Sequence, residues 1–78
     1  MHVNNTQLVE AFSDNVGTGK AEEIVETAAK SAGVGAKRRY SKEEALEVAE
    51  SVSDLDDVSR FVRISANTVK TRIRSGSL

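Results

Sequence analysis

The sequence predicts an all-α domain, a small bundle of about five short helices. Apolar residues recur every three to four positions along most of the chain, which is the period of a helix face, and strand-like alternation is nowhere sustained. The chain contains no proline, and candidate capping residues and glycines divide the periodic segments. A chain of 78 residues has the length of one domain, so we expect residues 1–78 to form a single helical unit.

The N-terminal part, residues 1–40, is expected to form a helical hairpin. The first helix starts at the cap candidates Asn4-Asn5-Thr6 and ends near Gly17, and the second runs from about Lys20 to Ala32. The apolar residues of the two helices are Leu8, Val9, Phe12, Val16, Ile24, Val25, Ala28, Ala29 and Ala32. These apolar faces could supply a dimerisation or partner surface.

Three further helices are expected in residues 41–78. The first starts with a capping box, in which Ser41 caps the helix and Glu44 reaches back to it. The next covers about Leu55 to Val62, and the last runs from Ala66 to about Ser75 with Ser65 as its cap. The core expected here is Phe61, Val62, Ile64, Val69 and Ile73, packed against Leu46, Ala49 and Val52.

Charge is balanced overall but uneven along the chain. The formal net charge is −1, which by itself argues against a nucleic-acid-binding protein. Residues 1–57 carry six basic and twelve acidic side chains, whereas residues 58–78 carry five basic and no acidic ones, so the two parts have charges of −6 and +5. The C-terminal segment can therefore present a cationic surface suited to phosphates, although a charged run can also be a solvated face.

The residue types exclude several classes of function. There is no cysteine, and the only histidine is His2, so thiol catalysis, disulfides and a metal centre are not expected. No catalytic constellation is present, and we expect neither an enzyme nor a cofactor. No apolar run approaches the roughly 20 residues of a membrane span. We therefore expect a cytoplasmic protein without a membrane partner.

Residues 55–74 show a pattern of two helices joined at Arg63-Ile64-Ser65. Its marker positions are Val58-Ser59, Val62, Ile64, Ser65 and Val69. This pattern resembles a helix-turn-helix DNA-binding motif. Residues 67–73 are similar to recognition helices of sigma-factor region 4, and residues 73–78 to the end of that helix in excisionase and MerR-like domains. Arg63 departs from the family, because that turn position is commonly glycine. The resemblance implies that residues 41–78 hold a DNA-binding part whose last helix enters the major groove.

A helical wheel of the last helix identifies candidate site residues. With Val69 and Ile73 facing inward, the opposite side is polar and free of carboxylates. The residues expected to read bases are Asn67, Lys70, Thr71 and Arg74, because amide, basic and hydroxyl side chains suit adenine, guanine and thymine edges. The residues expected on phosphates are Arg60, Arg63, Ser65, Thr68 and Arg72.

Two basic groups have alternative interpretations. Arg60 and Arg63 either contact phosphates or form surface ion pairs with Asp56 and Asp57. The second basic cluster, residues 37–39, is interpreted as a solvated loop, with a flanking phosphate contact as the alternative.

Two hypotheses of function follow. The first is a sequence-specific double-stranded DNA-binding protein, a small transcriptional regulator that acts as a homodimer because one recognition helix makes few base contacts. The second is a helical protein-interaction module whose basic C-terminal face binds an acidic partner. In the second case the acidic N-terminal half is either a further surface for a protein partner or an autoinhibitory one.

Overall fold

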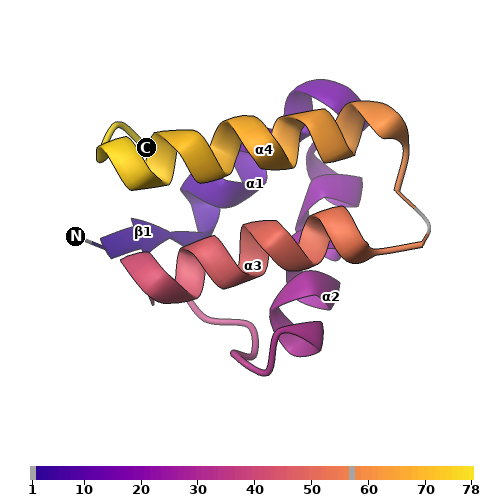
Figure 1. Ribbon diagram of the computed structural model, residues 1–78. Helices are drawn as coiled ribbons and strands as arrows, with labels where there is room; N and C mark the ends of the chain where they lie inside the picture. Colours follow the sequence, from indigo (N-terminus) through magenta and orange to yellow (C-terminus); the bar gives the residue numbers. More distant parts are fainter. Residues whose placement is uncertain (1, 57) are drawn as a thin grey trace.

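The computed structural model describes residues 2–56 and 58–78. Within them the chain forms four helices and a two-stranded antiparallel sheet (Figure 1). The elements in order are β1 (His2–Asn4), α1 (Asn5–Val16), α2 (Thr18–Ser31), β2 (Arg39–Ser41), α3 (Lys42–Asp54) and α4 (Arg60–Ser75). The mainly helical fold is confirmed, and the expected bounds of the first two helices and the expected start of the third agree with α1, α2 and α3 to within about two residues.

The prediction of two separate helices after residue 54 is wrong. Leu55 to Ser59 link α3 to α4, and the expected turn at residues 63–65 lies inside α4. The helix starts at Ser59, whose backbone is extended and whose Oγ accepts a hydrogen bond from the Val62 N–H at 3.4 Å. Neither glycine nor proline follows before Gly76, so nothing in the covalent chain stops the helix at Arg63.

The small sheet was not predicted, and it joins the two ends of the N-terminal part. Val3 pairs with Tyr40 at its centre, and both side chains are fully buried. The Tyr40 hydroxyl accepts a hydrogen bond from the Lys37 N–H at 3.2 Å and donates one to Asn5 Oδ1 at 3.3 Å. Tyr40 therefore belongs to the core, and its strand leads directly into α3.

The predicted capping box of α3 is confirmed. The Glu44 N–H donates to Ser41 Oγ at 3.2 Å, and the Ser41 N–H donates to Glu44 Oε1 at 2.9 Å. The hydrogen bond from Lys37, followed by that from the Ser41 backbone, holds the pKa of the Glu44 carboxyl below its ordinary value. The stabilisation from this ionised carboxyl is therefore present above the ordinary pKa and is lost as the pH falls through the lowered one.

One core joins all four helices, and α4 contributes a regular inward stripe to it. That stripe, with spacing of four, three and four residues, is Val62, Ala66, Val69 and Ile73. The expectation that Phe61 and Ile64 are core residues is wrong, because their side chains are 68% and 54% exposed. In a continuous helix Ile64 lies about 200° and Phe61 about 100° away from Val62, so neither can join the stripe.

The apolar faces of α1 and α2 do not form an exposed partner surface as expected. Leu8, Phe12, Val25 and Ala28 are fully buried within the same chain. Burial of these faces is what a domain of this size needs for its own stability, since its ratio of surface to volume is high. The N-terminal helices therefore serve the core.

The start of α4 can be tested with two serine substitutions. We expect Ser59→Ala to lower the free energy of unfolding by about 1 kcal/mol, because it removes the helix cap. Ser65→Ala should change it by less than about 0.5 kcal/mol, because residue 65 lies within a helix, where alanine is favourable. Equilibrium urea denaturation of both variants measures the difference, and the reverse order would show that a helix begins at Ser65.

The position of Phe61 can be tested against a buried phenylalanine of the same size. Phe12→Ala should cost about 3–5 kcal/mol, because Phe12 is fully buried. Phe61→Ala should cost less than about 0.5 kcal/mol, since most of that side chain already contacts water. Thermal or urea unfolding compares the two, and similar large losses would place Phe61 in the core.

Candidate nucleic-acid interface

A row of four basic residues and one asparagine runs along the whole of α4. We call these residues, spaced three and four apart, the basic row: Arg60, Arg63, Asn67, Lys70 and Arg74. At 100° per residue they fall within an arc of about 80°, clear of the inward stripe. All are exposed except Lys70, which is half-buried. Burial of Val62, Ala66, Val69 and Ile73 thus fixes the rotation of the helix and turns the row to the surface.

The charges of the basic row are not neutralised within the described part of the chain. No acidic residue occurs in α4. The ion pairs found among residues 2–56 and 58–78 lie elsewhere and join Lys20 to Glu23, Lys30 to Glu26 and Lys37 to Glu44. The expected alternative that Arg60 or Arg63 pairs with Asp56 is not observed, and Asp57 lies outside the described residues. Arg63 Nη2 instead donates to the Leu55 carbonyl at 3.4 Å, which ties α4 to the linker.

The C-terminal end of α4 favours positive charge. Gly76 takes a left-handed conformation, with φ of 76°, and its N–H donates to the Ile73 carbonyl at 3.1 Å. Arg72 and Arg74 lie in the last turn, where the partial negative charge of the helix end stabilises cations.

The structure does not bring all the predicted site residues to one surface. Asn67, Lys70 and Arg74 lie in the basic row together with Arg60, which was expected on the preceding helix, and Arg63, which was expected in the turn. Thr71 borders the row, and its Oγ1 donates to the Asn67 carbonyl at 3.1 Å. A 3-4 spacing read from residue 60 to residue 74 would have found the whole row, but the expected turn at residues 63–65 divided it.

The other predicted phosphate contacts lie on the side of α4 that faces α1. Ser65, Thr68 and Arg72 line a shallow hollow of about 310 Å³ there, together with Ala11 and Asp14 of α1. Ser65 cannot cap a helix from this position, because residues on both sides of it are helical. The predicted phosphate site at free backbone N–H groups after Ser65 is therefore absent.

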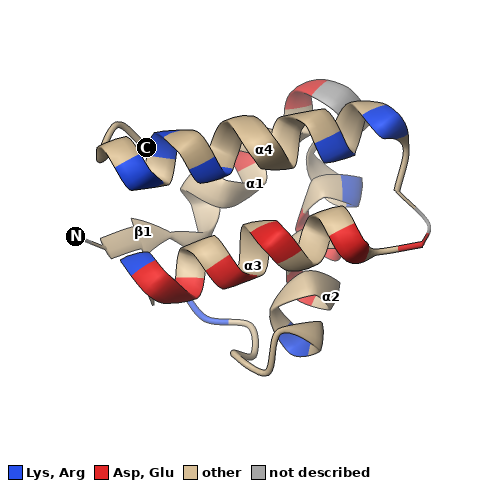
Figure 2. Ribbon diagram, in the orientation of Figure 1, with Lys and Arg blue, Asp and Glu red and all other residues tan. Residues whose placement is uncertain are grey.

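An acidic surface lies beside the basic row. Exposed carboxylates follow α3 at a spacing of four, three and four residues, and we call them the acidic row: Glu43, Glu47, Glu50 and Asp54. Since α3 packs against α4, the acidic segments of α3 and the basic segments of α4 run next to each other in Figure 2. A polyanion approaching α4 therefore meets attraction from one helix and repulsion from the next.

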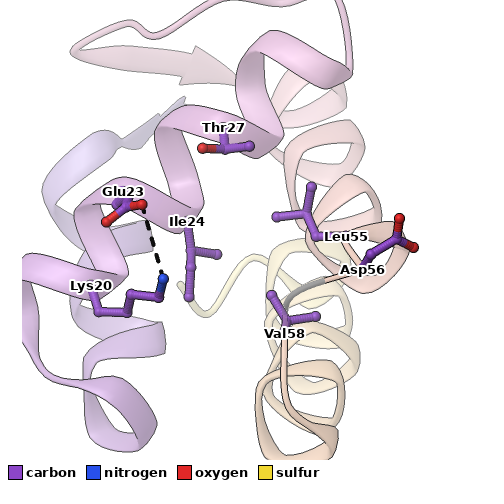
Figure 3. A pocket seen from close by; sticks show the side chains of 7 residues that line it. All are labelled: Lys20, Glu23, Ile24, Thr27, Leu55, Asp56 and Val58. Atoms are coloured by element: carbon purple, nitrogen blue, oxygen red, sulfur yellow. Dashed lines mark ion pairs between the residues drawn. The ribbon is translucent and has the colours of Figure 1, made fainter.

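Another hollow, with a volume of about 240 Å³, lies between α2 and the α3–α4 linker. Figure 3 shows the side chains that line it, among them Ile24, Leu55 and Val58. In this hollow Lys20 Nζ lies 4.0 Å from Glu23 Oε1. The described lining of the hollow has no histidine or cysteine, and its Lys20 and Glu23 side chains pair with each other, so it suggests no reaction.

The second basic cluster lies near the start of α1. The side chains of residues 37–39 line an open hollow with Asn4, Asn5 and Thr6. Lys37 is paired with Glu44, and the Arg38 carbonyl accepts a hydrogen bond from the Asn5 N–H at 2.8 Å. The cluster thus has local structural partners, while Arg38 and Arg39 remain exposed.

Comparison of the chain with protein-family models, curated proteins and solved structures finds no match. Among the described residues, no helix has the length and apolar character to cross a membrane, and no three His, Cys, Asp or Glu side chains are grouped to hold a metal ion. The resemblance to helix-turn-helix proteins thus gains no support from a relative. The function has to be inferred from the side chains of α4 and their surroundings.

Proposed function

We propose that this protein binds double-stranded DNA through the basic row of α4. The observation that carries the proposal is that α4 has five basic side chains and no acidic one, and that four of the five lie in one row, exposed except for the half-buried Lys70. Clustered basic side chains on one helix face are the usual electrostatic signature of a nucleic-acid contact. The proposal does not require a turn within α4.

The dimensions of the row suit a DNA groove. Arg60 and Arg74 are 14 positions apart, about 21 Å along a helix. The major groove of B-DNA admits an α-helix, and its base edges suit the side chains near the middle of the row. In this arrangement Asn67, Lys70 and Arg74 face base edges with Thr71 beside them, while Arg60 and Arg63 contact phosphates.

The acidic row on α3 weakens this binding. Carboxylates beside the DNA repel its phosphates, so the favourable interaction depends on the few basic residues of α4 and is screened by salt. One helix also reads few base pairs, and sequence-specific regulation of transcription would require two copies on two half-sites. We therefore infer modest affinity for a single copy, which falls as ionic strength rises.

A second candidate function is binding of an acidic protein partner. It is favoured by Phe61 and Ile64, the two large apolar side chains that are exposed next to Arg60 and Arg63. A partner with acidic and apolar residues on one face would satisfy both kinds of side chain, whereas exposed apolar groups add little to a phosphate contact.

Duplex binding measured by fluorescence anisotropy at several salt concentrations tests the DNA proposal. For the wild-type chain, the logarithm of the association constant should fall linearly with the logarithm of salt concentration, by about 0.9 per phosphate neutralised. Arg60→Ala with Arg63→Ala, which removes the two proposed phosphate contacts, should weaken binding to all duplexes and reduce the slope by about two. Lys20→Ala with Lys30→Ala, which removes two basic residues of α2, is the matched control and should leave both quantities unchanged.

Two results would contradict the proposal. One is the absence of any salt-dependent duplex binding by the folded wild-type chain. The other is equal loss in the α2 control and the α4 variant, which would mean that only overall charge matters. Binding of an acidic amphipathic peptide in place of DNA, lost in Phe61→Ala, would favour the second candidate.

A further inference from the structure

The acidic row and the basic row form one surface, which we call the two-row face. Figure 1 shows α3 and α4 running in opposite directions as neighbours, joined by a short linker. Asp54 is the last residue of α3 and Arg60 is the first residue of α4. The acidic row extends about 16 Å and the basic row about 21 Å at the rise of a helix. The face is therefore divided lengthwise into an acidic half and a basic half of similar length.

Both halves are exposed, and their charges are unpaired. All four carboxylates of the acidic row are exposed. None of them reaches a basic side chain within 4.0 Å in the described residues, because the ion pairs there involve only Glu23, Glu26 and Glu44. The two rows lie side by side without neutralising each other at contact distance. Each row is thus available to a surface of opposite charge.

We propose that the two-row face binds the same face of a second copy of this chain. A two-fold axis that lies in the contact plane between the two copies, over the seam between α3 and α4 and parallel to both helices, places the acidic row of each copy opposite the basic row of the other. The same patch then serves on both subunits, as in the closed dimers that are most common among homo-oligomers. Rotation about any axis perpendicular to the helices would instead oppose like charges, so charge alone selects the first arrangement.

The register of this arrangement follows from the symmetry. Because α3 and α4 run in opposite directions, the axis keeps the linker ends of the two copies together. Asp54 then lies near Arg60 and Arg63 of the other copy, and Glu43 lies near its Arg74. Ile64 neighbours Arg60 and Asn67 on the helix surface and is exposed, so it adds apolar area at the edge of the contact. Exposed ion pairs are individually weak, and the dimer should be weak and sensitive to salt.

The dimer has a consequence for DNA, which rests on the function proposed above. The acidic row of a second copy would occupy the basic row where phosphates are proposed to bind. Self-association and DNA binding would then exclude each other, and dilution or DNA would release the basic row.

Sedimentation equilibrium of the full chain tests the proposal in the absence of DNA. At about 20 mM salt the average mass should rise with concentration from 8.4 kDa toward twice that value, and at about 500 mM salt it should return to that of the monomer. A wild-type chain that stays monomeric at low salt up to about 1 mM protein would overturn the proposal.

Charge reversal of each row identifies the face. Glu47→Lys with Glu50→Lys reverses the charge at the middle of the acidic row, and Arg63→Glu with Lys70→Glu reverses it at the middle of the basic row. In either variant alone, like charges then meet at the middle of the interface, whereas in a mixture the reversed positions face each other with opposite charge. Each variant alone should lose association by at least about tenfold, whereas an equimolar mixture should associate at least as tightly as the wild type. Glu22→Lys with Glu23→Lys on α2 makes the same change in net charge as the first variant and should associate like the wild type.

Other outcomes would overturn this assignment. If either reversed variant associates like the wild type, or if the mixture remains monomeric, the two-row face is not the interface. Circular dichroism checks that each variant is folded. If a reversed variant unfolds, it is replaced by the neutral variants, which are Glu47→Gln with Glu50→Gln and Arg63→Gln with Lys70→Gln. If both neutral variants associate like the wild type, the two-row face is not the interface.

A DNA arm separates failure of this proposal from failure of the proposed function. Addition of duplex at low salt should convert the dimer into DNA-bound monomers. If the chain forms dimers that do not bind DNA, the DNA proposal is contradicted and the self-association proposal is supported. If the chain binds DNA but stays monomeric without it, the self-association proposal is contradicted and the DNA proposal is supported.

Discussion

The rotation of α4 about its own axis is fixed by the burial of four apolar side chains. Val62, Ala66, Val69 and Ile73 are the residues of α4 that are buried, and they pack in the interior shared with α1 and α3. The remaining positions are mainly charged or polar, so the helix gains stability from packing in only one orientation. That orientation turns the basic row outward and leaves Phe61 and Ile64 in contact with water. The surface chemistry of the C-terminal segment is thus a consequence of the core.

The contact between Val3 and Tyr40 has a comparable role for the N-terminal part. Two three-residue strands would be marginal by themselves, but their central side chains are buried in the helical core. The pairing places the start of α1 beside the residues that precede α3, and the Asn5 N–H to Arg38 carbonyl bond reinforces it. α3 therefore starts from a fixed point, which in turn positions the acidic row next to α4.

The electrostatics of the surface explains how one small domain could have two partners. An even charge distribution would favour neither DNA nor a second copy. Here the net charge is only −1, yet rows of opposite sign lie on neighbouring helices. The basic row attracts phosphates, and it attracts the acidic row of another copy for the same electrostatic reason. Whether DNA or a second copy occupies the basic row, the charges in the contact lie near solvent, so the interaction weakens as ionic strength rises.

Local signals in the sequence determined much of this fold. The caps at Asn4 and Ser41 and the glycine at residue 17 define α1 and α3 because they satisfy or end backbone hydrogen bonding within a few residues. The cationic character of residues 58–78 is likewise independent of packing. These features could be predicted because the physical cause lies within a few positions along the chain.

Only the tertiary structure decided the strands, the length of α4 and the composition of the candidate site. Each strand has a single buried residue, too few to show alternation, and Val3 and Tyr40 meet only when the chain folds. Ser59 and Ser65 are equally good caps by residue type. Burial of the stripe that begins at Val62 is what favours a helix from Ser59 onward, and this burial depends on α1 and α3. Arg60 and Arg63 consequently join Asn67, Lys70 and Arg74 in one row, which a turn at residues 63–65 would have divided.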